Sequence, residues 1–164
     1  MALVQLRDIL SVADRAAVMD LRRGPGQDQY LNSMEDIFDE ADEEQRAMPH
    51  PLAVHDAQTG ALVGFAMISD NIPPPIDDDL VGPYFLWKLL IDHRFQRRAY
   101  GAATIDAVAD YVRSRPGADV LYTSCADGPG SPRGFYLRYG FTDTGRVMWD
   151  ENVLALDLAP GKPG

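Results

Sequence analysis

The sequence holds a single cysteine, Cys125, among its 164 residues. One thiol cannot close a disulfide within the chain, which excludes the class of small secreted domains that disulfides hold together. Histidine is scarce as well, and the three histidines lack the close spacing of metal ligands (His50, His55 and His93). We therefore expect no metal cofactor.

Long apolar runs are also missing. No stretch reaches the ~18 consecutive apolar residues that a membrane-spanning helix needs. Residues 1–11 carry Arg7 and Asp8 and lack the pattern of a signal peptide. We therefore expect a cytoplasmic protein without a membrane partner.

Positive charge is in short supply, with 15 Lys and Arg against 25 Asp and Glu and a net charge of −10. A protein that tracks nucleic-acid phosphates needs a basic face, so we expect no nucleic-acid partner. The imbalance lies in residues 1–80, which hold five basic and sixteen acidic side chains, whereas residues 81–164 hold ten and nine. The two parts of the chain are expected to meet differently charged ligands.

The composition is that of a globular protein, because 46% of the residues are hydrophobic and 24% are charged. This length fits one domain, since domains usually span ~100 to 200 residues. We expect a single domain over residues 1–158 and a flexible tail over residues 159–164.

Helical and strand-like patterns alternate along the chain. We expect a mixed α/β (α+β) fold. Ser11 is the expected cap of a first helix whose apolar positions include Val12, Ala16 and Met19. An acidic amphipathic helix follows, with the apolar face Tyr30, Met34, Ile37, Phe38 and Ala41. A later helix carries the apolar stripe Ile105, Val108, Ala109 and Val112, and a short helix runs through 135–139. Strands are expected at 3–6, 52–55, 61–68, 84–91, 120–125, 147–149 and 153–158, with a turn at 150–152.

The most informative stretch is residues 89–102, where the apolar strand runs through a basic turn into a helix. Such a turn directs unpaired backbone N–H groups at one point, and the helix dipole adds positive potential there. Three arginines, Arg94, Arg97 and Arg98, strengthen the prediction of a phosphate-bearing ligand. The alternative is a solvated turn with surface arginines.

The turn resembles the signature of the GNAT superfamily of acyl-CoA-dependent N-acetyltransferases. That signature is Gln or Arg, two variable residues, Gly, one variable residue, then Gly or Ala, and it matches residues 96–101 except that Ala99 replaces the first glycine. Residues 135–141 are similar to the family's second hallmark, a short helix that runs into a Gly-Phe strand entry. The resemblance implies a mainly antiparallel sheet with splayed central strands, flanked by about four helices.

The resemblance also implies acetyl-CoA as the cosubstrate. The strand end would offer backbone groups to the pantetheine arm and the turn would hold the pyrophosphate. The implied cofactor-binding residues are Leu89, Leu90, Ile91, Gln96, Arg97, Arg98, Ala99, Tyr100, Gly101 and Ala102.

The alanine at position 99 departs from the signature where glycine permits a positive φ or close ligand approach. Either the turn keeps φ negative at Ala99 or affinity is reduced, since an alanine forced to positive φ costs roughly 1 kcal/mol or more. Arg97 and Arg98 would offset that loss by charge-assisted contacts with phosphate.

Acetylation of an amine requires removal of a proton, because a primary amine with a pKa near ~10.4 is almost wholly protonated at neutral pH. Residues 84–91 contain no carboxylate. Asp92 at the end of that strand is the first candidate base and Glu35 a weaker one, with a water relay as an alternative. Asp92 is equally suited to a structural role in the turn.

Tyr136 resembles the family tyrosine beside the leaving sulfur. A phenol is a weaker acid than a thiol, so a hydrogen bond to the developing thiolate is the better expectation than complete proton transfer. The alternative is a core aromatic residue. The backbone N–H of Leu90 or Ile91 is the expected donor to the acetyl oxygen.

The acidic stretches 35–44 and 77–79 suggest a groove that attracts a small cationic amine, with Glu35 and Trp87 as candidate substrate-binding residues. The motifs look most like those of the diamine and spermidine acetyltransferase branch, although antibiotic-like amines and peptide N-termini stay open. A homodimer is allowed. Two other functions compete: a CoA-binding regulatory or scaffold domain without turnover, and a nucleotide-binding α/β domain.

Overall fold

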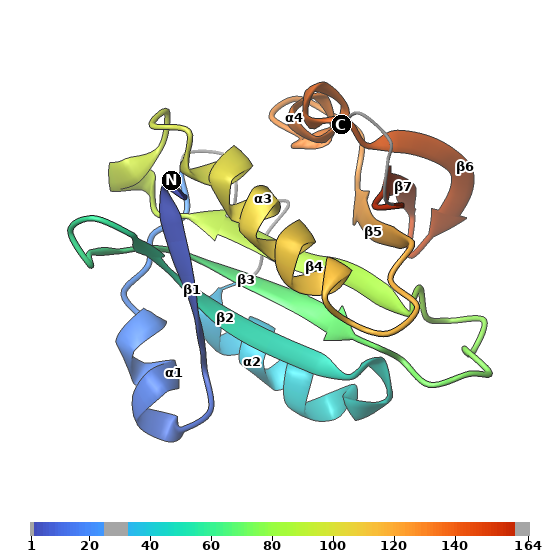
Figure 1. Ribbon diagram of the computed structural model, residues 1–164, viewed down its shortest axis with the longest axis horizontal. Coiled ribbons are helices and arrows are strands. Elements are labelled where there is room, and N and C mark those ends of the chain that lie inside the picture. The colour runs from blue at the N-terminus through green and yellow to red at the C-terminus, as the bar shows by residue number, and fades with distance from the viewer. Residues whose placement is uncertain (1, 25–32, 160–164) are drawn as a thin grey trace.

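A computed structural model describes residues 2–24 and 33–159. One mixed sheet of seven strands forms its centre, in the order β1-β2-β3-β4-β5-β7-β6 (Figure 1). The strands are β1 (Val4–Asp8), β2 (Pro49–Asp56), β3 (Leu62–Asp70), β4 (Tyr84–Ile91), β5 (Val120–Cys125), β6 (Thr142–Met148) and β7 (Glu151–Asp157). Only β4 and β5 are parallel; the other neighbours are antiparallel.

Four α-helices flank the sheet within the described residues: α1 (Val12–Val18), α2 (Met34–Glu43), α3 (Tyr100–Arg113) and α4 (Arg133–Tyr139). Two short 3-10 helices, η2 (Gln45–Ala47) and η3 (His93–Phe95), lie between elements. The expected fold class is therefore confirmed. Among the described residues, no helix combines the length and the hydropathy that crossing a bilayer requires.

The core has two layers, one on each face of the sheet. On one face α3 packs its expected stripe against β2, β3, β4 and β5 (Ile105, Val108, Ala109 and Val112). On the other face α1 and α2 pack against β2, β3 and β4 through Val18, Ile37, Phe38 and Ala41 (Figure 1). Strand β4 is covered on both faces, which explains its almost continuous apolar sequence.

The central strands splay apart at a bulge. Strand β4 pairs with β3 along its whole length, but with β5 only at Phe85 and Leu86. The β3–β4 register shifts between Met67 and Ile68, so that Trp87 is an extra residue on β4. Because a bulge bends its strand, β4 leaves β5 from this point, and the ribbon of β5 turns away towards α4 (Figure 1).

Four local expectations need correction or lie outside the described residues. The first helix buries Val18 and exposes Val12, which is 85% exposed. The turn expected at 150–152 lies at Trp149 and Asp150, whose φ values of 53° and 60° fit a two-residue hairpin turn. Glu151 therefore opens β7. Tyr30 and residues 160–164 lie outside the described residues.

Candidate active site

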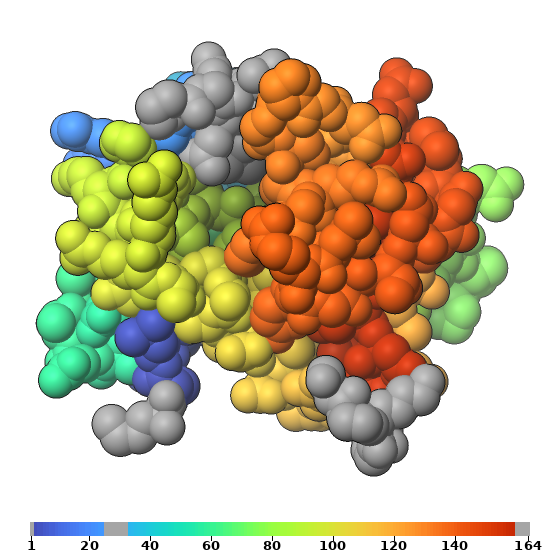
Figure 2. Space-filling model, turned by 90° about the horizontal axis from the view of Figure 1, so that it is seen from above, coloured from blue at the N-terminus to red at the C-terminus, as the bar shows by residue number. Residues whose placement is uncertain are grey.

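The turn between η3 and α3 presents free backbone donors. The amide N–H groups of residues 99–102 donate to no protein acceptor within the described ranges, and α3 has no side-chain cap. Arg97 and Arg98 are exposed, and Gln96 Nε2 donates to the carbonyl oxygen of Ile91 at 3.2 Å. The molecular surface is hollowed between this segment and the residues around α4 (Figure 2). These groups fit a diphosphate.

Ala99 adopts the conformation that glycine would favour. Its φ is 64°, and Arg97 has a φ of 65°. The possibility that the turn avoids a positive φ at Ala99 is thus wrong. The chain accepts left-handed strain at both positions, directly before the free amides of the first turn of α3.

Tyr100 and Gly101 of the signature also help to hold the fold together, in addition to offering their backbone N–H groups. The Tyr100 side chain is buried, and its hydroxyl donates to Asp56 Oδ2 at 2.6 Å, which anchors the start of α3 to the β2–β3 turn. A Cβ on Gly101 would lie 3.1 Å from Cζ of Phe135. The close approach of α3 to α4 therefore requires a small residue at 101.

Asp92 is fully buried, and its carboxylate is occupied by structural hydrogen bonds. It accepts from the backbone N–H of Arg22 and Arg94 at 2.9 Å each and from Arg94 Nε and Nη2 at 2.8 Å each. The Arg94 side chain is the main cause that lowers the pKa of Asp92 to about 2. This environment suits a residue that shapes the turn, and it disfavours a general base near neutral pH.

Every second backbone N–H group of β4 faces the gap that opens where β5 diverges from β4. Asp92 N–H donates to Val63 of β3 at 2.8 Å. Because backbone groups alternate along a strand, the N–H of Leu90 also points to β3, whereas those of Leu89 and Ile91 point to the side from which β5 has diverged. Ile91 is therefore the better candidate for a donor to the acetyl oxygen, and the expectation for the Leu90 amide is corrected.

Tyr136 lies on α4 at the place where the strands part. It is 6% exposed and packs between Phe135 and Phe141. Burial raises the pKa of Tyr136 to about 12. The neighbouring Thr123 donates its hydroxyl proton to the carbonyl oxygen of Leu86 at 2.9 Å, at the last paired residues of β4 and β5. Tyr136 is thus a neutral hydrogen-bond donor at neutral pH.

A cavity of about 410 Å³ lies beside the splayed strands. Its lining comes from the end of α2, η2, the loop before β4, the β6–β7 turn and strands β3, β4, β5 and β7. The lining residues are Glu40, Glu43, Glu44, Ala47, Ser69, Asp79, Leu80, Val81, Phe85, Trp87, Lys88, Ser124, Trp149 and Glu151. Five carboxylates face one lysine, and three aromatic side chains complete the wall. Such a lining suits a cationic ligand with an apolar backbone.

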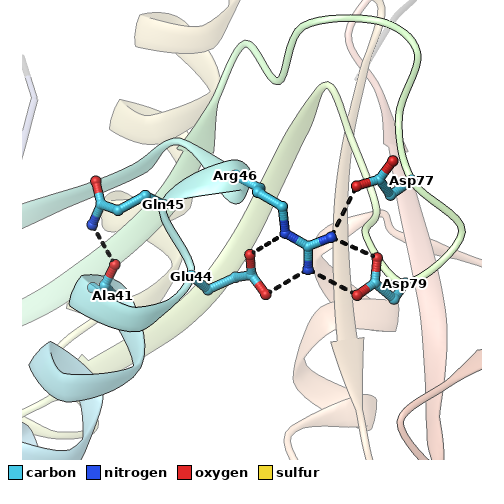
Figure 3. A network of polar contacts seen from close by, with 6 residues as sticks. All are labelled: Ala41, Glu44, Gln45, Arg46, Asp77 and Asp79. Carbon is cyan, nitrogen blue, oxygen red and sulfur yellow. Dashed lines mark hydrogen bonds and ion pairs between the residues drawn. The ribbon is translucent and has the colours of Figure 1, made fainter.

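Some of these carboxylates already form ion pairs with basic side chains. Arg46 binds Glu44, Asp77 and Asp79 with contacts of 2.8 to 2.9 Å, which ties the end of α2 to the loop before β4 (Figure 3). Arg46 also lowers the pKa of Glu44 and Asp79. Lys88 lies 3.3 Å from Glu40.

The structure brings Trp87 to the cavity but not Glu35, which is exposed in the first turn of α2. The sequence reasoning missed Ser124 and Glu151 as lining residues. No local signal marked them, because they come from separate strands that meet only in the sheet. The acidic stretch did predict the charge that Glu40, Glu43 and Glu44 bring to the cavity.

Comparison with known proteins agrees with this geometry. The model of the acetyltransferase (GNAT) family matches residues 15–141. No curated protein sequence matches the chain. The spermidine N-acetyltransferase of Vibrio cholerae, solved with CoA and spermine, is 15% identical with a TM-score of 0.63, covering 96% of this chain and 97% of its own.

Two further structures are similar. An aminoglycoside 6'-N-acetyltransferase with coenzyme A is 17% identical with a TM-score of 0.64, covering 98% of this chain and 99% of its own. A GNAT-family N-acetyltransferase of Escherichia coli with CoA is 15% identical with a TM-score of 0.64, covering 97% of this chain and 83% of its own. At such identities the likeness shows a shared fold. The family model spans most of the chain, and the chain therefore belongs to the acetyltransferase (GNAT) family.

Proposed function

We propose that this protein transfers the acetyl group of acetyl-CoA to a primary amine of a small cationic acceptor while both are bound. One observation carries the proposal: a cavity with five carboxylates and three aromatic side chains lies beside the point where β4 and β5 part. The free amides at the start of α3 lie on the same segment that follows β4.

Different groups of the chain would bind different parts of acetyl-CoA, which supplies the activated acyl group as a thioester. The amides of residues 99–102, with Arg97 and Arg98, would hold the diphosphate and the ribose phosphate. The outward N–H groups of Leu89 and Ile91 would hold the pantetheine arm and the acetyl oxygen.

Tyr136 would donate a hydrogen bond to the sulfur as negative charge develops there. Its pKa of about 12 makes complete proton donation unfavourable, because the thiol that would form is the stronger acid. A neutral phenol that stays protonated through the reaction is a suitable donor of this kind.

The acceptor we favour is a diamine or a polyamine. Several ammonium groups on a flexible apolar chain match several carboxylates set among Phe85, Trp87 and Trp149. The neighbours of known substrate act on spermidine and on aminoglycosides, which are both polycations. The cytoplasmic location expected from the sequence, and the homodimer that the sequence allows, stay predictions.

The test is a screen of putrescine, spermidine and an aminoglycoside, with release of the CoA thiol as the readout. We expect turnover with at least one of them, and kcat reduced at least about tenfold in Tyr136→Phe. Tyr139→Phe is the matched control, because Tyr139 lies on the same helix and its hydroxyl bonds Asp106. If CoA binds and every amine gives a flat trace, the domain binds CoA without turnover and the proposal is wrong.

A further inference from the structure

The five carboxylates of the cavity differ in whether they already form an ion pair with a basic side chain. Glu40 pairs with Lys88, while Glu44 and Asp79 pair with Arg46. Within residues 2–24 and 33–159, neither Glu43 nor Glu151 has an ion-pair partner. These two carboxylates are the ones available to receive a proton from an ammonium group.

Glu151 is held in place by a neighbouring strand. Ser124 Oγ of β5 donates to Glu151 Oε1 at 2.6 Å. In the described part of the chain the other carboxylate oxygen, Oε2, accepts no hydrogen bond. Glu151 is half-buried, whereas Glu43 is exposed at the end of α2. One oxygen of Glu151 is thus fixed, and the other is left for a ligand in the cavity.

Glu151 also lies in the electrostatic environment of Tyr136. After burial, the negative charges of Cys125 and Glu151 contribute to the raised pKa of that tyrosine, and no such contribution comes from Glu43. Ser124 follows Thr123, the last residue of β5 that pairs with β4. Of the two unpaired cavity carboxylates, Glu151 is therefore the one that β5 holds at the point where β4 and β5 part.

We infer that Glu151 is the general base that removes the proton from the acceptor ammonium, and that Ser124 is a positioning residue for it. The inference rests on the proposed function and names the base that Asp92 does not supply. The ammonium N–H bond breaks and its proton passes to Oε2 of Glu151. The amine nitrogen then bonds to the thioester carbonyl carbon and the C–S bond breaks. The second proton of the nitrogen passes to the sulfur, and Glu151 releases its proton to solvent.

The test compares Glu151→Gln with Glu43→Gln, because each removes one carboxylate charge from the same cavity. We expect Glu151→Gln to lower kcat about 10²-fold or more at pH 7. The deficit should shrink as the pH approaches the amine pKa of ~10.4, where neutral acceptor is abundant. Glu43→Gln is expected to raise KM for the acceptor and to leave the shape of the pH profile as in the wild type. CoA binding by calorimetry checks that both variants are folded.

Ser124 supplies a second test that does not remove the carboxylate. Ser124→Ala should lower kcat about tenfold, and Ser124→Thr, which keeps the hydroxyl, should restore most of it. If Glu151→Gln and Glu43→Gln show the same kcat and the same pH profile, the assignment of the base is overturned although acetylation stands. If the wild type itself turns over no amine, the proposed function fails instead.

Discussion

Gly101 of α3 faces the ring of Phe135 on α4, and an added Cβ would lie 3.1 Å from Phe135 Cζ. This contact joins the two sequence motifs that indicated the family, because one residue belongs to the basic turn and helix and the other to the short second helix. Close packing at this point sets how near the basic turn lies to Tyr136.

Gly101→Ala should lower the free energy of unfolding by about 1 kcal/mol, because the methyl group overpacks the ring. In a Phe135→Leu background, Gly101→Ala should leave the free energy of unfolding unchanged or raise it slightly, since alanine is the better helix former. Urea unfolding of the wild type, the two single variants and the double variant measures the coupling between the two residues. Additive effects in that cycle would show that the two residues do not press on each other.

Ala99→Gly should stabilise the fold by about 0.5 kcal/mol, because relief of the left-handed strain exceeds the entropy that glycine loses on folding. Ala102→Gly is the control on the same helix, where the conformation is ordinary, and it should destabilise by up to about 1 kcal/mol. Denaturant midpoints compare the two variants. A change of the same sign in both would contradict the role given to the positive φ of Ala99.

Asp92→Asn should lower the free energy of unfolding at pH 7 by about 2 kcal/mol, because the folded protein holds the pKa of Asp92 near 2, below its ordinary value of 3.8. A lowered carboxyl pKa stabilises the folded state above about pH 4, and this contribution disappears as the pH falls towards 2. The difference between wild type and variant should therefore close over that range.

Asp78→Asn is the control for Asp92, because Asp78 is an exposed carboxylate. Its unfolding free energy should follow that of the wild type from pH 7 to pH 2. A constant gap between wild type and Asp92→Asn at all these pH values would mean that the loss comes from packing and not from the ionised form.

Arg46→Ala should free the loop before β4 without much loss of global stability. The guanidinium is half exposed, so its solvent-screened ion pairs contribute little to the free energy of unfolding. Amide exchange around 77–80 should nevertheless become faster, because Arg46 joins that loop to the end of α2 (Figure 3). Arg113→Ala, which removes the Arg113–Asp110 pair within α3, should leave exchange in the loop unchanged.

Much of the architecture was predictable from periodicity and local motifs. The boundaries of β4 agree with the apolar run 84–91, and the buried stripe of α3 is the expected one. The basic turn with free amides followed from local signals alone, because a strand, a turn and a helix start lie within fourteen consecutive residues. In contrast, the turn between β6 and β7 was misplaced, and with it the position of Glu151.

Local sequence was thus sufficient to predict the family, most helices and strands, and the basic turn with its free amides, since each depends on neighbours within a few residues of the chain. Folding in three dimensions determined which carboxylates are free. The Asp92 carboxylate accepts a hydrogen bond from the amide of Arg22, seventy positions earlier in the chain. Glu151 on β7 accepts a hydrogen bond from Ser124 on the neighbouring strand β5. Hydrogen bonds between distant segments distinguish a structural carboxylate from one that is available for chemistry, and no spacing in the sequence records them.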